Sequence, residues 1–99
     1  MIFKTQQQFR AELKLEEIVY YYENIQLGLG NRFLNNYENL LEKLETFPFF
    51  EQKYNVIRKL PFNKFPYTIH FQLYEFENIV HIETISCNYQ NPSDIKIRF

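Results

Sequence analysis

Apolar residues are spaced in two different ways, which divide the chain into a helical half and a half made of strands. From residue 11 to residue 25 they recur at steps of four and three, so they lie along one stripe of a helix. This stripe comprises Ala11, Leu15, Ile18, Tyr22 and Ile25. The same spacing returns in residues 33–47, and Pro48 then ends the second helix because proline cannot continue its hydrogen bonds.

The link between the two helices contains the glycines Gly28 and Gly30. A link of only a few residues joins two helices as an antiparallel hairpin. Asn31 follows this link, and its side-chain oxygen can accept a hydrogen bond from a free amide at a helix start. We therefore predict Asn31 as the capping residue of the second helix.

After the second helix the apolar spacing changes to two, which is typical of strands. Residues 54–62 form one predicted strand, and residues 64–73 form the next, with five apolar side chains on one face. The other face of that strand carries Pro66, Thr68, His70 and Gln72. Residues 75–78 predict a turn into a last strand that contains Ile79, Val80, Ile82 and Ile85, and residues 1–5 predict a short first strand.

These elements predict an α+β fold with two layers. An N-terminal strand precedes the antiparallel two-helix hairpin, and three antiparallel strands follow as a meander in one sheet. Both helices would cover one face of the sheet and leave the other face for solvent or a partner. A length of 99 residues suits a single domain, residues 1–99, and its eleven Phe and eight Tyr predict a core rich in aromatic rings.

Charge, cysteine content and the lengths of apolar runs limit the partners and the cellular compartment that we expect. Eleven basic and twelve acidic residues give a net charge of -1, so no overall field attracts nucleic acid. The single cysteine, Cys87, cannot form an intramolecular disulfide, no secretory leader opens the chain, and no apolar run is long enough to cross a bilayer. We expect a cytoplasmic protein without contact to a membrane.

Candidate chemistry is concentrated in a basic stretch and the strand that follows it. Arg58 and Lys59 are neighbours on a strand, so their side chains should point to opposite faces and cannot both contact one phosphate. Lys64 and His70 follow, and the position of His70 on the polar face fits either a plain surface imidazole or a group that contacts a target. The histidines and cysteine lack the spacing of metal ligands, so we expect no metal and no cofactor.

Three tyrosines in succession, Tyr20, Tyr21 and Tyr22, cannot all face the core. Neighbouring residues on a helix point in directions that differ by about a third of a turn. At least one of these rings is therefore expected at the surface or in a contact.

Four segments together resemble the RelE/ParE family of type II toxin–antitoxin toxins, and in particular its ParE-like members. They are residues 13–22, residues 29–34 (Leu-Gly-Asn-Arg-Phe-Leu), residues 57–59 (Ile-Arg-Lys) and residues 64–67 (Lys-Phe-Pro-Tyr). The resemblance implies the fold described above and a toxin that arrests bacterial growth, as in plasmid stabilisation. It also implies a cognate antitoxin as the partner, with a heterotetramer as one form of the complex.

The segment near the C-terminus departs from the pattern of that family. Many members have a His, two spacers, an Arg and then Asp or Asn before a Pro, whereas here Cys87 stands at the His position and Gln90 at the Arg position. A thiol is a poorer acid–base group than an imidazole at pH 7, and Gln supplies no cation to a phosphate. These replacements favour target binding over nuclease chemistry.

Three functions stay open on the sequence alone. The first is a ParE-like toxin that binds DNA gyrase, with Arg58, Lys59, Lys64 and Gln90 as the target-binding residues. The second is a RelE-like mRNA endonuclease that depends on the ribosome, with Arg58, Lys64 and His70 as catalytic candidates. The third is an attenuated member that only binds its antitoxin. The resemblance leaves enzymatic activity undecided, and the C-terminal replacements favour a protein without it.

Overall fold

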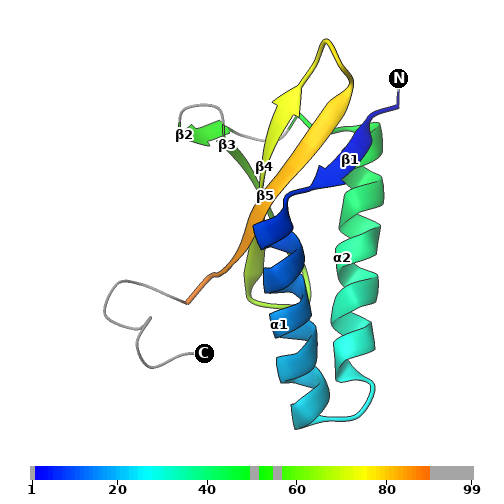
Figure 1. Ribbon diagram of the computed structural model, residues 1–99, viewed down its shortest axis with the longest axis vertical. Helices are drawn as coiled ribbons and strands as arrows, with labels where there is room; N and C mark the ends of the chain where they lie inside the picture. Colours follow the sequence, from blue (N-terminus) through cyan, green and yellow to red (C-terminus); the bar gives the residue numbers. More distant parts are fainter. Residues whose placement is uncertain (1, 50–51, 55–56, 90–99) are drawn as a thin grey trace.

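The computed structural model describes residues 2–49, 52–54 and 57–89, and these contain two helices and five strands. In chain order the elements are β1 (Lys4–Gln7), α1 (Phe9–Ile25), α2 (Leu29–Thr46), β2 (Gln52–Tyr54), β3 (Ile57–Pro61), β4 (Tyr67–Tyr74) and β5 (Ile79–Cys87). Figure 1 shows α1 and α2 side by side and antiparallel, as the apolar spacing predicts.

The five strands form one sheet in the order β1-β5-β4-β3-β2. Strands β3, β4 and β5 pair antiparallel and make the predicted three-strand meander, while β1 pairs parallel with β5. The predicted α+β fold, with a strand, a helical hairpin and an antiparallel meander, is therefore confirmed.

Three strand boundaries differ from the prediction. The predicted strand 64–73 begins only at Tyr67, as β4, and residues 64–66 lie in the loop before it. The predicted strand 54–62 is divided, because Gln52–Tyr54 forms β2 and pairs antiparallel with β3, which begins at Ile57 and ends at Pro61. The first strand lies at Lys4–Gln7 rather than at residues 1–5. Its polar side chains gave no strand signal, since parallel pairing with β5 needs only the backbone of β1.

The ends of β1 are held by backbone contacts that the sequence pattern does not reveal. The Phe3 amide donates to the Glu45 carbonyl at 2.7 Å, and the Gln8 amide donates to the Ile82 carbonyl at 2.9 Å. The Phe3 ring is only 3% exposed and joins the core. β1 therefore connects the end of α2 to β5 and adds a fifth strand to the sheet.

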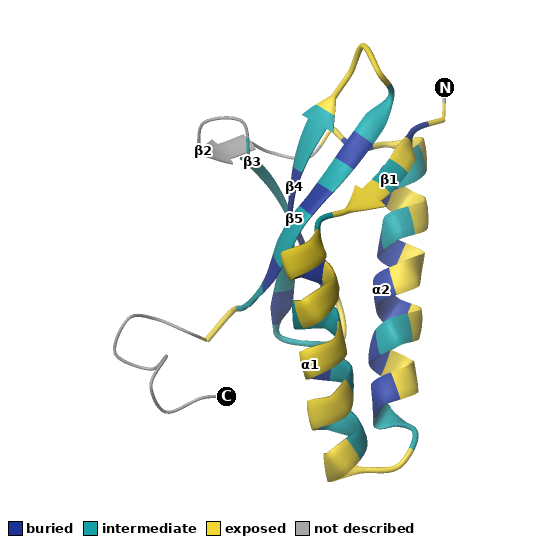
Figure 2. Cartoon of the chain, in the orientation of Figure 1, coloured by how far each residue is buried: buried dark blue, intermediate teal, exposed yellow. Residues whose placement is uncertain are grey.

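One face of the sheet packs against the hairpin, and the burial colours of Figure 2 follow this layering along α2. Ile69, Phe71, Val80 and Ile82 on this face are completely buried. Ile85 is also buried although it follows Ile82 by three residues, an odd step for a strand. A bulge explains this, because Phe71 lies opposite Ile82 and His70 opposite Thr84, which leaves Glu83 without a partner in the ladder.

Aromatic rings fill the space between the hairpin and the loop that joins β3 to β4. Phe33 of α2 stacks on Phe62 with ring centroids 4.8 Å apart and also packs edge-on against Phe65 at 5.1 Å. Tyr22 of α1 joins this cluster through Phe33 and Phe65. Each ring removes a large apolar area from water, so this cluster contributes much of the driving force for packing α1 and α2 onto the sheet.

The start of α2 is stabilised in a way that differs from the prediction. Asn31 is not the capping residue, because α2 begins at Leu29 and its N-cap residue is Gly28. Glycine has no side chain that could accept a hydrogen bond from the helix. The carboxylate of Glu23 on α1 instead accepts hydrogen bonds from the Gly28 amide at 2.9 Å and the Gly30 amide at 3.0 Å. A carboxylate at this helix N-terminus satisfies free amides and interacts favourably with the helix dipole.

Both glycines of the link are required by local geometry. Gly28 has a φ of 90°, a conformation that residues with a Cβ adopt at a cost. A Cβ added to Gly30 would lie 2.6 Å from the carbonyl oxygen of Val19, a backbone atom of α1. Gly30 therefore allows α1 and α2 to approach each other closely.

Candidate functional site

The face of the sheet that points away from the helices carries most of the polar strand residues. Strand register places Lys59 of β3 opposite His70 of β4, and His70 opposite Thr84 of β5. Thr68 and Ser86 form the next pair in the same row. We call this surface the outer sheet face, and His70 lies at its centre.

His70 is buried, which differs from the surface imidazole that its place on a polar face suggested. It is 8% exposed, and its Nε2 lies 2.7 Å from the Ser86 hydroxyl. Burial and the nearby Lys59 ammonium lower the pKa of His70 below its usual value, because both disfavour the charged imidazolium. The ring is therefore neutral at pH 7, and its Nε2 is already engaged with a neighbouring strand.

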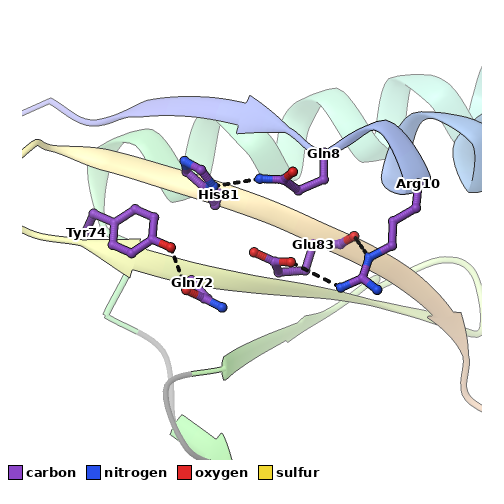
Figure 3. A network of polar contacts seen from close by, with 6 residues as sticks. All are labelled: Gln8, Arg10, Gln72, Tyr74, His81 and Glu83. Atoms are coloured by element: carbon purple, nitrogen blue, oxygen red, sulfur yellow. Dashed lines mark hydrogen bonds and ion pairs between the residues drawn. The ribbon is translucent and has the colours of Figure 1, made fainter.

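A second group of polar contacts surrounds the start of β5 and the end of β4 (Figure 3). The His81 Nδ1 lies 2.7 Å from Nε2 of the Gln8 side chain. The Tyr74 ring packs edge-on against His81, with ring centroids 4.7 Å apart. The Tyr74 hydroxyl donates to Gln72 at 2.8 Å. These contacts connect neighbouring side chains to one another, which suits a structural role for His81.

The bulge residue on β5 has a partner from the hairpin. Arg10 of α1 donates to the Glu83 carbonyl and contacts the Glu83 carboxylate at 3.2 Å (Figure 3). The bulge turns Glu83 out of the regular ladder and makes this contact available. Arg10 is 70% exposed in its side chain, so the ion pair contributes about 1 kcal/mol at most.

The predicted basic residues are not brought into one cluster. Register places Lys59 in the same row as His70, whereas Arg58 lies opposite Phe71 and shares the row that faces the helices. Their opposite directions agree with the prediction from strand alternation. Lys64 lies elsewhere, in the loop before β4, where it lines a groove beside α2. Gln90 lies outside the described residues.

Cys87 is the last residue of β5 and pairs with Tyr67. Its side chain is half-buried and packs against the hydrophobic core. Because Tyr67 is buried on the row that faces the helices, Cys87 belongs to that side of the sheet and His70 to the other. The two groups therefore cannot act together on one reacting atom.

Within the described residues, no three His, Cys, Asp or Glu side chains gather as a metal site would require. No helix in the same part of the chain is long and apolar enough to span a membrane.

Two surfaces of the hairpin were missed by sequence reasoning. The first, which we call the α1 apolar face, comprises exposed side chains on the outside of α1, namely Phe9, Leu13, Tyr20, Tyr21 and Ile25. Tyr20 is 70% and Tyr21 46% exposed, whereas Tyr22 packs inward, which confirms that the three tyrosines cannot all face the core.

The second missed surface is the groove between α2 and the loop of residues 63–65. Arg32, Asn36, Asn39 and Lys43 line it and recur at steps of four, three and four. That spacing places them on one flank of α2, so it was the available signal. It was overlooked because the apolar stripe of α2 has the same period.

The arrangement of the chain is similar to solved toxin structures. A chain of the chromosomal ParDE TA system from P. aeruginosa is 13% identical with a TM-score of 0.74, over 87% of this chain and 96% of that one. The isolated E. coli RelE toxin is 10% identical with a TM-score of 0.51, over 96% of this chain and 94% of that one. No family model and no curated protein matches the chain in sequence. The chain therefore has the fold that its resemblance to RelE/ParE toxins implied.

Proposed function

We propose that this protein is the toxin of a bacterial type II toxin–antitoxin module and is related to the ParE-like members. The observation that carries this proposal is the similarity to a chain of the P. aeruginosa ParDE system, at a TM-score of 0.74 over 87% of this chain. The four resembling sequence segments support it independently, because they lie in order along α1, the start of α2, β3 and the entry to β4.

The proposed mode of action is binding of a macromolecular target, with DNA gyrase as the first candidate. Cleavage of RNA needs proton-transfer groups and cations around a single phosphate. The placement of Arg58 and Lys59 on opposite faces, and of the Ser86 hydroxyl on His70, argues against such a cluster among the described residues. Binding requires only a complementary surface, which dispersed charges can provide.

Two measurements on the wild-type protein test this proposal. Induced expression should arrest growth, and the purified protein should inhibit DNA supercoiling by gyrase at concentrations similar to those in arrested cells. Co-expression with the product of the adjacent reading frame should relieve both effects. Unchanged supercoiling at such concentrations would exclude gyrase as the target.

The same experiments separate the other two functions. Cleavage of mRNA in the ribosomal A site that is lost in Arg58→Ala would establish a RelE-like endonuclease instead. Expression without growth arrest, together with an intact antitoxin complex, would establish an attenuated member.

We also propose that the antitoxin covers the α1 apolar face. Tyr20 is 70% and Leu13 49% exposed on a helix whose opposite side is already packed. Exposed aromatic and aliphatic side chains of this kind act as anchors when a partner covers them. The antitoxin is the partner that the similarity to the ParDE system suggests for this surface.

A further inference from the structure

A groove of about 660 Å³ lies between one flank of α2 and the loop that joins β3 to β4. Seven of its ten lining residues come from α2, and the other three are the consecutive residues 63–65. None of them belongs to the outer sheet face or to the α1 apolar face. A volume of this size is within the range of sites for small ligands.

The charge of this groove contrasts with that of the whole chain. Arg32, Lys43 and Lys64 line it, and no carboxylate of the described residues does, although the net charge of the protein is -1. In the described parts of the chain, ion pairs join Arg10 to Glu83 and Lys14 to Glu17. Neither pair includes a cation of the groove. Cations gathered without an acidic partner favour an anionic ligand.

The positions of the cations indicate an elongated ligand. Arg32 and Lys43 are eleven residues apart on α2, which corresponds to about 16 Å along the helix axis. A single small anion cannot contact both side chains close to the helix. An extended molecule with several anionic groups, such as a nucleoside polyphosphate, can reach along this length.

The asparagines of the groove favour a ligand that carries hydrogen-bonding groups in addition to negative charge. Asn36 is 8% exposed, and its Nδ2 donates to the Asn63 Oδ1 at 2.9 Å. This contact fixes the Asn36 amide, while its Oδ1 is buried and has no hydrogen-bond partner among the described residues. A buried acceptor without a partner is unfavourable, so a ligand that brings an N–H or O–H donor would be stabilised there.

We propose that this groove binds a nucleotide, with its phosphates on Arg32, Lys43 and Lys64 and its base or ribose donating to Asn36. Asparagine amides pair with the edge of adenine, because they offer a donor and an acceptor side by side. Asn35 and Asn39 supply two further amides on the same flank, and Phe65 supplies an aromatic surface.

The lining favours a nucleotide over an acidic peptide. An extended peptide binds by pairing with a strand edge, and the described residues that line the groove include none from a strand. A helical peptide needs an apolar stripe, whereas only three of the ten lining residues, Leu29, Leu40 and Phe65, are apolar. The groove is instead dominated by amides and cations.

Calorimetric titration of the complete purified protein tests this proposal with ATP, AMP, adenosine, inorganic pyrophosphate and a single-stranded riboadenylate hexamer. We expect ATP to bind about tenfold more tightly than AMP and more tightly than adenosine or pyrophosphate, because only ATP combines several phosphates with a base. Tighter binding of the hexamer than of ATP would identify single-stranded RNA as the source of the nucleotide, and weaker binding would identify the free nucleotide.

Matched variants locate the binding. Lys64→Ala and Arg32→Ala should each weaken ATP binding about tenfold, and Asn39→Asp should weaken it at least as much. Lys4→Ala removes the same charge from exposed β1 and should leave ATP binding within about twofold. All four positions are exposed, so the fold should be retained, and circular dichroism checks this.

Three results would overturn the nucleotide site. They are equal weakening of ATP binding by Lys4→Ala and Lys64→Ala, pyrophosphate binding as tight as that of ATP, and binding of a hexapeptide of Asp and Glu in the absence of nucleotide binding. None of them bears on the proposed toxin function, which rests on the structural similarity and on the four resembling sequence segments.

Discussion

The helices α1 and α2 bury similar apolar stripes in one hairpin, but their remaining surfaces differ in chemistry. The outside of α1 exposes Tyr20 and Leu13, while the flank of α2 that borders the loop of residues 63–65 exposes cations and amides. Core packing requires only the buried stripe of each helix. The difference between the exposed sides is the basis of the two proposals, a protein partner on α1 and a nucleotide beside α2.

The largest effect is expected where the two helices meet. Gly30→Val would place a Cβ 2.6 Å from the Val19 carbonyl, and this backbone atom cannot move without displacing α1. We expect a loss of about 3 kcal/mol or more in the free energy of unfolding, measured by urea denaturation. Both surfaces of the hairpin should lose their ligands together in this variant.

Gly28→Ala is the matched control for this substitution. Apart from its chain neighbours, no described residue lies within 4 Å of the Cβ it would add, so its cost comes from the φ of 90°. We expect about 1 to 2 kcal/mol. An equal loss in both variants would show that backbone conformation, and not the contact with Val19, governs the hairpin.

Substitutions that add negative charge to one helix at a time test whether the antitoxin binds α1 and not the flank of α2. The double variant Leu13→Asp, Tyr20→Asp should weaken antitoxin binding at least about 30-fold, because two apolar anchors are replaced by charged groups. The double variant Asn35→Asp, Asn39→Asp adds the same charge to α2 and should leave antitoxin binding nearly unchanged. Titration calorimetry with the antitoxin measures both, and equal weakening would contradict the division between the helices.

A smaller effect is expected at the link. Glu23→Ala removes the carboxylate that accepts from the Gly28 and Gly30 amides, and should cost about 1 to 2 kcal/mol in the free energy of unfolding. Glu23→Gln retains an acceptor oxygen and should lose less. If thermal denaturation shows no loss in either variant, water replaces this cap.

The smallest effect concerns His70, which lies on the sheet face away from both hairpin surfaces. Its folded pKa is lowered, so the unfolded chain takes up the proton first as the pH falls. The contribution of the neutral ring is complete above the ordinary histidine pKa of about 6.5 and declines below it. Urea midpoints at about pH 8 and about pH 5 should differ more for the wild type than for His70→Gln. Equal differences in the wild type and in His70→Gln would mean that His70 does not contribute to the pH dependence of stability.

Much of the fold could be predicted because its signals are periodic. The stripe that begins at Ala11 and the alternation around Ile69 and Phe71 predicted the helix and the strand correctly, and Ala11, Ile18, Ile69 and Phe71 are buried as expected. Ile25 at the end of the stripe is the exception, because it is 59% exposed. Gly28 and Pro48 lie just outside the two ends of α2, and they marked these ends because glycine extends and proline restricts the conformations of the backbone. Their effect is local, so it can be interpreted without knowing the rest of the chain.

Features that depend on contacts between distant residues could not be predicted in this way. The cap on α2 comes from Glu23 on the preceding helix rather than from Asn31. The burial of His70 depends on Ser86, sixteen residues away, and on the β4–β5 register. Neither contact has a period or a motif, because each requires a particular packing of two elements.

The sequence by itself determined the order of the N-terminal strand, the two helices and the three-strand meander, the aromatic core and the resemblance to RelE/ParE toxins. Only the tertiary structure decided which polar residues share a surface: it placed Lys59 with His70, Arg58 on the helix-facing row and Lys64 with Arg32 and Lys43. The physical reason is that burial of apolar residues follows a local period, whereas a binding surface is assembled from elements whose separation in space is set by the packed core.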